Sequence, residues 1–172
     1  MLARITAAVA GLLFCLPAMA ETDSDTANAL SPVAPSVKIV NFTADWCPNC
    51  VLLNPRLDEL IERFDDGQIK RVDLDMTDAS RRAPKQQRMK AFARAIQTAE
   101  AHQVSYLWDW YGGITGIAVF ISADNGEPLT CVNRGFKVDD MEERMVQAIL
   151  LAEHGKPGER MPDGPDCPAP IR

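Results

Sequence analysis

Apolar residues recur between positions 37 and 154 with two different spacings, and these spacings predict alternating strands and helices. Short β-branched or alternating apolar runs are typical of strands, whereas apolar residues three and four positions apart are typical of one helix face. By these criteria we expect strands at 37–42, 69–74, 116–122 and 129–133, and helices at about 48–64, 84–102 and 138–154.

The inward faces of the later helices follow from the same spacing. We expect the middle helix to pack through Met89, Phe92, Ala93 and Ile96. We expect the last helix to pack through Met141, Met145 and Ile149, with Val146 as a further candidate.

The order of the elements predicts the fold class. Two strands each followed by a helix favour parallel pairing, and Asp124-Asn125-Gly126 predicts a hairpin between the last two strands. The sequence therefore predicts an α/β domain over residues 37–154, with a central mixed sheet of about four strands flanked by helices.

The two ends of the chain differ from this domain. Arg4, an apolar stretch at 7–16 and Ala18-Met19-Ala20 are typical of a signal peptide at 1–20 that is cleaved near Ala20. An uncleaved anchor is the alternative, but the apolar stretch is short for a membrane span. Residues 21–36 predict a flexible lead-in and residues 155–172 a Pro/Gly-rich irregular tail. We expect a periplasmic or secreted protein.

Charge and cysteine count narrow the function classes. The formal net charge is −6, from 18 basic and 24 acidic residues, and loss of Arg4 with the signal peptide makes it −7. An acidic chain argues against a nucleic-acid partner. Cys15 lies in the signal peptide, and the other four cysteines permit two disulfides in an oxidising compartment.

Cys47 and Cys50 lie between a predicted strand and a predicted helix. A helix N-terminus favours thiolate over thiol, and a second cysteine one turn later can close a disulfide with the first. We therefore expect an exposed reactive thiol at Cys47 and dithiol exchange. Two alternatives are a structural disulfide and a copper or zinc site that adds a histidine, although His102 and His154 lie at helix ends without ligand spacing to the pair.

The stretch F-T-A-D-W-C-P-N-C at 42–50, with Pro55 downstream, resembles the active site of the thioredoxin superfamily. Its A-D-W-C portion is similar to the C-terminal domain of the bacterial thiol transporter DsbD and related periplasmic reductases. The resemblance covers about residues 37–154 and implies a thioredoxin fold. It also implies a thiol–disulfide oxidoreductase in which Cys47 is the nucleophile and Cys50 the resolving thiol.

The chain departs from the family at two positions. Asn41 stands where the family has a buried aspartate that exchanges protons with the second cysteine, so that role would fall to water or to Asp45. Loss of the buried charge should also ease formation of the Cys50 thiolate. Thr115 replaces the family's cis-proline in the substrate loop. By resemblance, the substrate-binding residues would be Trp46, Pro48, Asn49, Ile114 and Thr115.

The resemblance also implies partners. We expect a protein disulfide as substrate, a membrane thiol transporter as electron donor, no cofactor and a monomeric protein. A reductase is favoured, whereas Pro48 resembles the C-P-x-C of stronger oxidants and leaves an oxidase or isomerase open.

Three further features of the sequence each allow two interpretations. Cys131 and Cys167 are expected to form a structural disulfide that pins the tail, or else a second redox pair. The aromatic cluster at 108–111 is expected to pack under a loop, or else to dock a substrate. The third feature is a basic stretch, expected to be a solvated helix face or else a docking patch for an acidic partner or lipid headgroups: Arg81, Arg82, Lys85, Arg88, Lys90 and Arg94.

Overall fold

The computed structural model describes residues 34–64 and 67–171. The predicted signal peptide at 1–20 lies outside the described residues, as does the predicted lead-in as far as residue 33. Within the described ranges, no helix combines the length and the apolar character that crossing a membrane requires.

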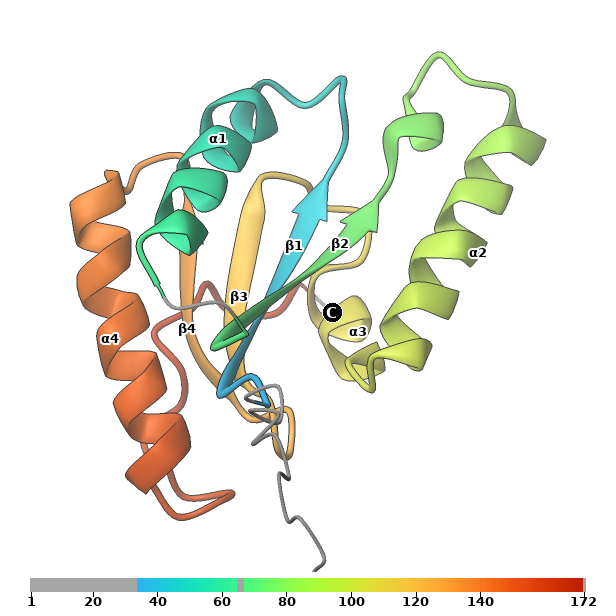
Figure 1. Ribbon diagram of the computed structural model, residues 1–172. Coiled ribbons are helices and arrows are strands. Elements are labelled where there is room, and N and C mark those ends of the chain that lie inside the picture. The colour runs from blue at the N-terminus through green and yellow to red at the C-terminus, as the bar shows by residue number, and fades with distance from the viewer. Residues whose placement is uncertain (1–33, 65–66, 172) are drawn as a thin grey trace, which may run out of the picture. The chain divides into compact units, whose positions relative to one another are not determined.

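A mixed sheet of four strands forms the centre of the fold (Figure 1). The strand order is β2-β1-β3-β4, with β1 parallel to β2 and antiparallel to β3, and with β3 antiparallel to β4. The strands are β1 (Val37–Thr43), β2 (Ile69–Asp75), β3 (Ile117–Ser122) and β4 (Pro128–Asn133). Each begins and ends within one residue of its expected bounds, and the expected fold class is confirmed.

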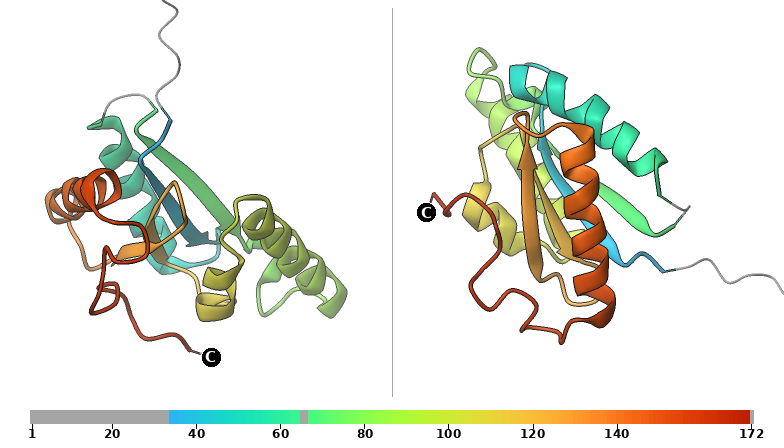
Figure 2. Two further views of the ribbon diagram at one scale, coloured as in Figure 1. Left: turned by 90° about the horizontal axis from the view of Figure 1, so that it is seen from below. Right: turned by 90° about the vertical axis from the view of Figure 1, so that its left-hand side faces the viewer.

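Helices cover both faces of this sheet (Figure 2). α1 and α4 pack on one face, and α2 and α3 lie on the other. The helices are α1 (Pro48–Glu62), α2 (Lys85–Ala101), α3 (Ser105–Tyr111) and α4 (Val138–His154), with a short 3-10 turn, η1 (Thr77–Ala79), after β2. Each face has its own buried apolar cluster.

β1 is the most enclosed strand. Val37 and Ile39 pack in the cluster of α1 and α4, whereas Val40 and Phe42 pack in the cluster of α2 and α3. A strand covered on both faces needs a largely apolar sequence, which β1 has apart from Lys38, Asn41 and Thr43.

The expected inward face of α2 is partly wrong. Met89 is 61% exposed and Ala93 is exposed, while Phe92 and Ile96 are half-buried. The buried positions are instead the alanines at 91, 95 and 99, one turn apart. Small side chains at this spacing let the helix approach its neighbours closely, so the large apolar residues lie at the edges of the contact. Likewise Val146 in α4 is 45% exposed and is not a core residue.

The helix α3 was not expected. Its seven residues are too few to show a helical period, and five of them are aromatic or leucine, which also suit a strand or a packed loop. In the structure Leu107 and Tyr111 are buried, and the Trp110 ring lies edge-to-face with that of Tyr106. The aromatic cluster therefore packs against the sheet through one side of a short helix.

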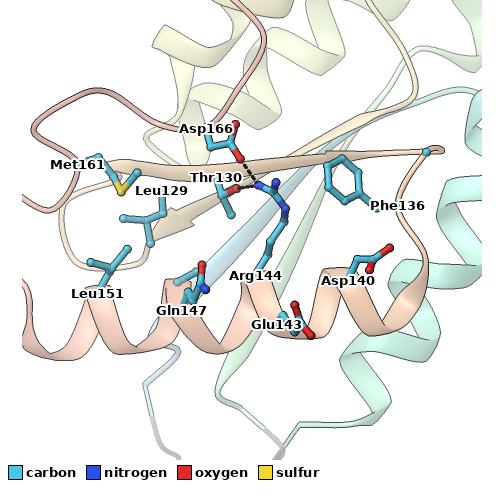
Figure 3. Close-up of a pocket in the computed structure, with 12 residues that line it drawn as sticks. Leu129, Thr130, Phe136, Asp140, Glu143, Arg144, Gln147, Leu151, Met161 and Asp166 are labelled. Carbon is cyan, nitrogen blue, oxygen red and sulfur yellow. Dashed lines mark hydrogen bonds and ion pairs between the residues drawn. The ribbon is translucent and has the colours of Figure 1, made fainter.

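The C-terminal tail, residues 155–171, is irregular and is attached along β4. Cys131 and Cys167 are joined by a disulfide, with their Cα atoms 4.9 Å apart. Beside it, Arg144 of α4 donates to Thr130 Oγ1 and pairs with Asp166 Oδ2, each at 2.6 Å (Figure 3).

A buried guanidinium fixes the start of this tail. The side chain of Arg160 is 2% exposed, pairs with Asp124 and Glu127 of the β3–β4 turn, and donates to the carbonyl oxygens of Leu151 and Ala152. The Arg160 hydrogen bond lowers the pKa of Asp124. Because all of the guanidinium nitrogens meet oxygen partners, the free-energy cost of burying the charge is offset. These contacts hold the first residues of the tail against α4 and the β3–β4 turn.

Candidate active site

Cys47 and Cys50 lie where β1 passes into α1. Cys47 is the N-cap residue of α1, with extended backbone angles, and Pro48 occupies the first turn, where a missing N–H costs nothing. The backbone N–H of Cys50 donates to Cys47 Sγ over 3.1 Å. The two cysteines are joined as a disulfide, with Cα atoms 5.2 Å apart. Helix-end charge and this N–H both favour a thiolate at Cys47 when the pair is reduced.

The expected exposure of Cys47 is wrong. Its relative exposure is 2% and that of Cys50 is 1%, and both belong to the apolar cluster on the α2 and α3 side. Cys47 packs in this cluster with Tyr111 of α3 and Ile117 of β3, and Ile114 of the loop between them packs against the same cluster. Pro48, the next residue along the chain, is exposed.

Trp46 and Asp45 belong to a loop that is tied to the end of β2. The Trp46 indole N–H donates to the carbonyl oxygens of Met76 and Thr77, and the indole is 44% exposed. Asp45 donates its backbone N–H to Thr77 Oγ1, and its side chain is exposed. The structure thus brings Trp46 to the surface next to Cys47, while the Asp45 side chain lies on the surface and Cys50 is buried.

The loop at 113–116 faces the cysteine pair, as the sequence predicted. No cis peptide bond occurs within the described ranges, so the bond preceding Thr115 is trans. Gly116 has φ +85° and donates its N–H to Phe42 O at the end of β1. A Cβ at Gly116 would lie 2.5 Å from Asn49 Cβ, so the backbone here touches the residue between the two cysteines.

The tail is a neighbour of the site that sequence reasoning missed. Asn49, Ile114 and Thr115 line a hollow of about 430 Å³, and Pro168 and Ile171 of the tail line it with them. Tyr111 Oη donates to Pro168 O, and Ile171 N–H donates to Trp110 O. The one sequence signal for this arrangement was the expected Cys131–Cys167 disulfide, which the structure contains.

Asn41 is fully buried on β1 and is held by two oxygen acceptors. Its amide Nδ2 donates to Asp73 Oδ1 at 2.7 Å and to Asn54 Oδ1 at 3.1 Å. Asn54 lies one helical turn after Cys50 on the same face of α1, and its own amide donates to Thr43 Oγ1. Asp73 is the residue opposite Asn41 in the β1–β2 register.

This register gives a physical reason for the amide at position 41. An aspartate there would bring a buried carboxylate against Asp73, and two close carboxylates raise each other's pKa. The amide instead supplies the N–H that both acceptors need. Its own Oδ1 is buried and finds no hydrogen-bond partner within the described residues.

The histidines lie away from this site. His102 is the C-cap of α2, and burial, followed by the charges of Lys70 and Lys38, lowers its pKa. His154 ends α4. In the described part of the chain, no group of three or more His, Cys, Asp or Glu side chains is arranged to hold a metal ion.

Comparison with known proteins finds one family, and the matching part of the family profile includes the cysteine pair. The family profile described as Thioredoxin matches residues 21–93. A thioredoxin of Geodia cydonium is 32% identical over 72 residues, which are 42% of this chain and 68% of that protein. Thioredoxin H8 of Arabidopsis thaliana is 37% identical over 38 residues, 22% of this chain and 26% of that protein. The crystal structure of StoA from Bacillus subtilis aligns with a TM-score of 0.41 and 16% identity, over 66% of this chain and 85% of that one.

The alignment with the Geodia thioredoxin covers 68% of that protein at 32% identity, which is enough to assign this chain to the same family. This chain belongs to the thioredoxin family and is a thiol–disulfide oxidoreductase.

The first prediction tests the reason for Asn41. In Asn41→Asp, the new carboxyl is buried and faces only oxygens, so its folded-state pKa rises above the unfolded value of about 3.9. We expect the free energy of unfolding to fall by about 3 kcal/mol at pH 8. The loss should shrink as the pH falls through the raised folded-state pKa, because the folded carboxyl is then protonated, and it should be smallest below about 3.9, where both states are protonated. Denaturant unfolding at several pH values measures this.

The matched control is the double variant Asn41→Asp/Asp73→Asn, which exchanges acid and amide across the two strands. It should recover part of the lost stability at pH 8, because one amide again faces one carboxylate while the Arg71–Asp73 ion pair is lost. A loss that is equal at all pH values, or no recovery in the double variant, would contradict the explanation.

The second prediction compares two glycines of the substrate loop. Gly113 and Gly116 have φ of +90° and +85°, so alanine costs about 1 kcal/mol in backbone conformation at either position. At Gly113 the added Cβ meets nothing within 4 Å, whereas at Gly116 it clashes with Asn49. We expect Gly116→Ala to lose about 2 kcal/mol more than Gly113→Ala and to reduce a disulfide substrate more slowly. Equal stability and equal rates would show that Asn49 is not positioned by Gly116.

Proposed function

We propose that this thiol–disulfide oxidoreductase acts outside the cytoplasm, in the periplasm or as a secreted protein, and reduces disulfides of other proteins. The observation that carries the proposal is the place of Cys47, at the N-cap of α1 with the Cys50 N–H 3.1 Å from its sulfur. This arrangement supplies thiolate at neutral pH and keeps the resolving cysteine within one helical turn.

The reaction passes two electrons from the cysteine pair to the substrate. The Cys47 thiolate attacks one sulfur of the substrate disulfide, forms a mixed disulfide and releases the other substrate sulfur, which takes up a proton. Cys50 then loses its proton and attacks Cys47 Sγ. This second step releases the remaining substrate thiol and leaves the Cys47–Cys50 disulfide seen in the structure.

The proton of Cys50 leaves from a buried position. Cys50 Sγ lies 3.9 Å from Phe42 O, and the neighbouring Asn41 side chain cannot titrate. Asp45 is the nearest acid in the sequence, but its side chain lies on the surface. We therefore assign the proton to water that enters when substrate binding moves the 113–116 loop, with Asp45 as the surface acceptor.

Two features support an oxidising compartment. Residues 1–20 have the pattern of a cleaved signal peptide. Cys131 and Cys167 form a disulfide of their own, separate from the Cys47–Cys50 pair, and structural disulfides of this kind persist mainly outside the cytoplasm. A reductase working there needs an electron source, and a membrane thiol transporter that hands over a dithiol fits this requirement.

The third prediction is a trapping experiment in the cell. Cys50→Ser removes the resolving thiol, so the mixed disulfide on Cys47 should persist and appear as higher-mass species on non-reducing gels. Cys47→Ser removes the nucleophile, and it should give no such species at equal expression.

The control for the second disulfide is Cys50→Ser combined with Cys131→Ser and Cys167→Ser, which should trap the same partners. No disulfide-linked partner with Cys50→Ser, or partners that depend on Cys131 or Cys167, would contradict the proposed function.

A further inference from the structure

A second hollow lies beside Trp46, the residue before Cys47, on the side of α2. Its volume is about 1020 Å³, and it is lined by Trp46, the connection from η1 to α2, the first turns of α2 and the 113–116 loop. The η1–α2 connection and the loop from β1 into α1 lie at the same end of the sheet (Figure 1). Any partner whose disulfide approaches Cys47 past Trp46 therefore meets this hollow.

Three arginines line this hollow: Arg81, Arg82 and Arg88. We refer to the hollow with these three residues as the arginine hollow. Arg81 and Arg82 are exposed, and Arg88 donates only to the carbonyl oxygens of Arg81 and Ala83. In the described part of the chain, none of the three has a carboxylate partner. Elsewhere a carboxylate pairs with each of Arg63, Arg71, Arg94, Arg144 and Arg160.

The nearby acids leave this positive charge largely uncompensated. Asp78 forms an ion pair with Arg94 at 2.5 Å and accepts a hydrogen bond from the Gln87 amide. Asp75 accepts hydrogen bonds from the backbone N–H and the hydroxyl of Thr77. Asp45, on the loop beside Trp46, is an exposed carboxylate of this region. Lys85 and Lys90 add two exposed positive charges on α2. The arginine hollow is therefore locally basic in a chain of net charge −6.

An apolar surface accompanies the charges. Phe92 lies in the hollow and its ring is edge-to-face with Trp108 at 5.9 Å, while Trp46 exposes 44% of its surface at the other side. Guanidinium groups beside aromatic rings suit a peptide that carries carboxylates on an otherwise extended chain. Because the chain as a whole carries a net negative charge, an acidic peptide is attracted to this basic hollow and is oriented by it.

We propose that the arginine hollow docks an acidic segment next to the reactive cysteine of a protein substrate, and so selects substrates by charge. This inference rests on the proposed function, since it assigns a substrate class to the same cysteine pair. The attraction acts before any electron transfer, so it raises the second-order rate constant of reduction and weakens with salt.

The test uses the reduced full-length protein and two synthetic disulfide peptides that differ only in flanking residues, aspartates in one and lysines in the other. Trp46 lies beside the cysteines, so the reaction is followed by its fluorescence in a stopped-flow instrument. At low salt we expect the acidic peptide to be reduced roughly tenfold faster than the basic one, with most of this ratio lost at about 0.5 M salt.

The variant Arg81→Glu/Arg82→Glu should abolish or invert this preference without changing the rate with an uncharged disulfide. The matched control is Lys70→Glu/Lys156→Glu, which makes the same change of net charge at the opposite end of the sheet and should keep the preference. Both variants replace exposed residues, and an unfolding curve for each checks that it folds.

The outcomes separate the two proposals. If the protein reduces none of the disulfides, the proposed function fails. If it reduces acidic and basic peptides equally, or if both variants shift the preference alike, the arginine hollow has no such role. Faster reduction of glutathione disulfide than of the acidic peptide, or arginine-dependent binding to vesicles of anionic lipid, would overturn the inference in favour of a small anion or a membrane surface.

Discussion

The enclosure of β1 is the constraint on which the active site depends. This strand is hydrogen-bonded to β2 on one edge and β3 on the other, and helices cover both of its faces. Its C-terminal end therefore has one position, and the next residues bring Cys47 to the N-cap of α1. The same end accepts the N–H of Gly116 at Phe42 O, which fixes the 113–116 loop against Asn49. One buried strand thus positions both cysteines and the loop beside them.

Both cysteines of the site are buried in the folded protein. Cys47 has 2% exposure, and the tail, held by Cys131–Cys167 and by Arg144, forms a wall beside Asn49 and Thr115. Enclosure protects a low-pKa thiolate from unwanted oxidants, and it leaves selection of partners to the surfaces around the opening. Those surfaces differ in chemistry, because the tail side presents Pro168, Ile171 and one arginine, Arg134, whereas the α2 side presents three arginines.

Local signals in the sequence were enough for the fold and for the cysteine pair. The strands, the helices α1, α2 and α4, and the helix-end position of Cys47 follow from apolar spacing and from Pro48. Long-range packing was not accessible in this way. The burial of Cys47 depends on a loop more than sixty residues later in the chain, and the inward face of α2 depends on how closely alanines let it approach β2. The reason for Asn41 required the β1–β2 register, which places Asp73 opposite it.

The central claim is that Cys47–Cys50 is a reversible redox couple and Cys131–Cys167 a structural bond. The most direct test equilibrates the protein in thiol buffers of graded potential, traps free thiols by alkylation in acid and assigns them to each pair by mass spectrometry. The account predicts that Cys47–Cys50 is reduced and reoxidised along a single two-electron curve while Cys131–Cys167 stays oxidised over the same range. A Cys47–Cys50 pair that stays oxidised until Cys131–Cys167 is also reduced would contradict it.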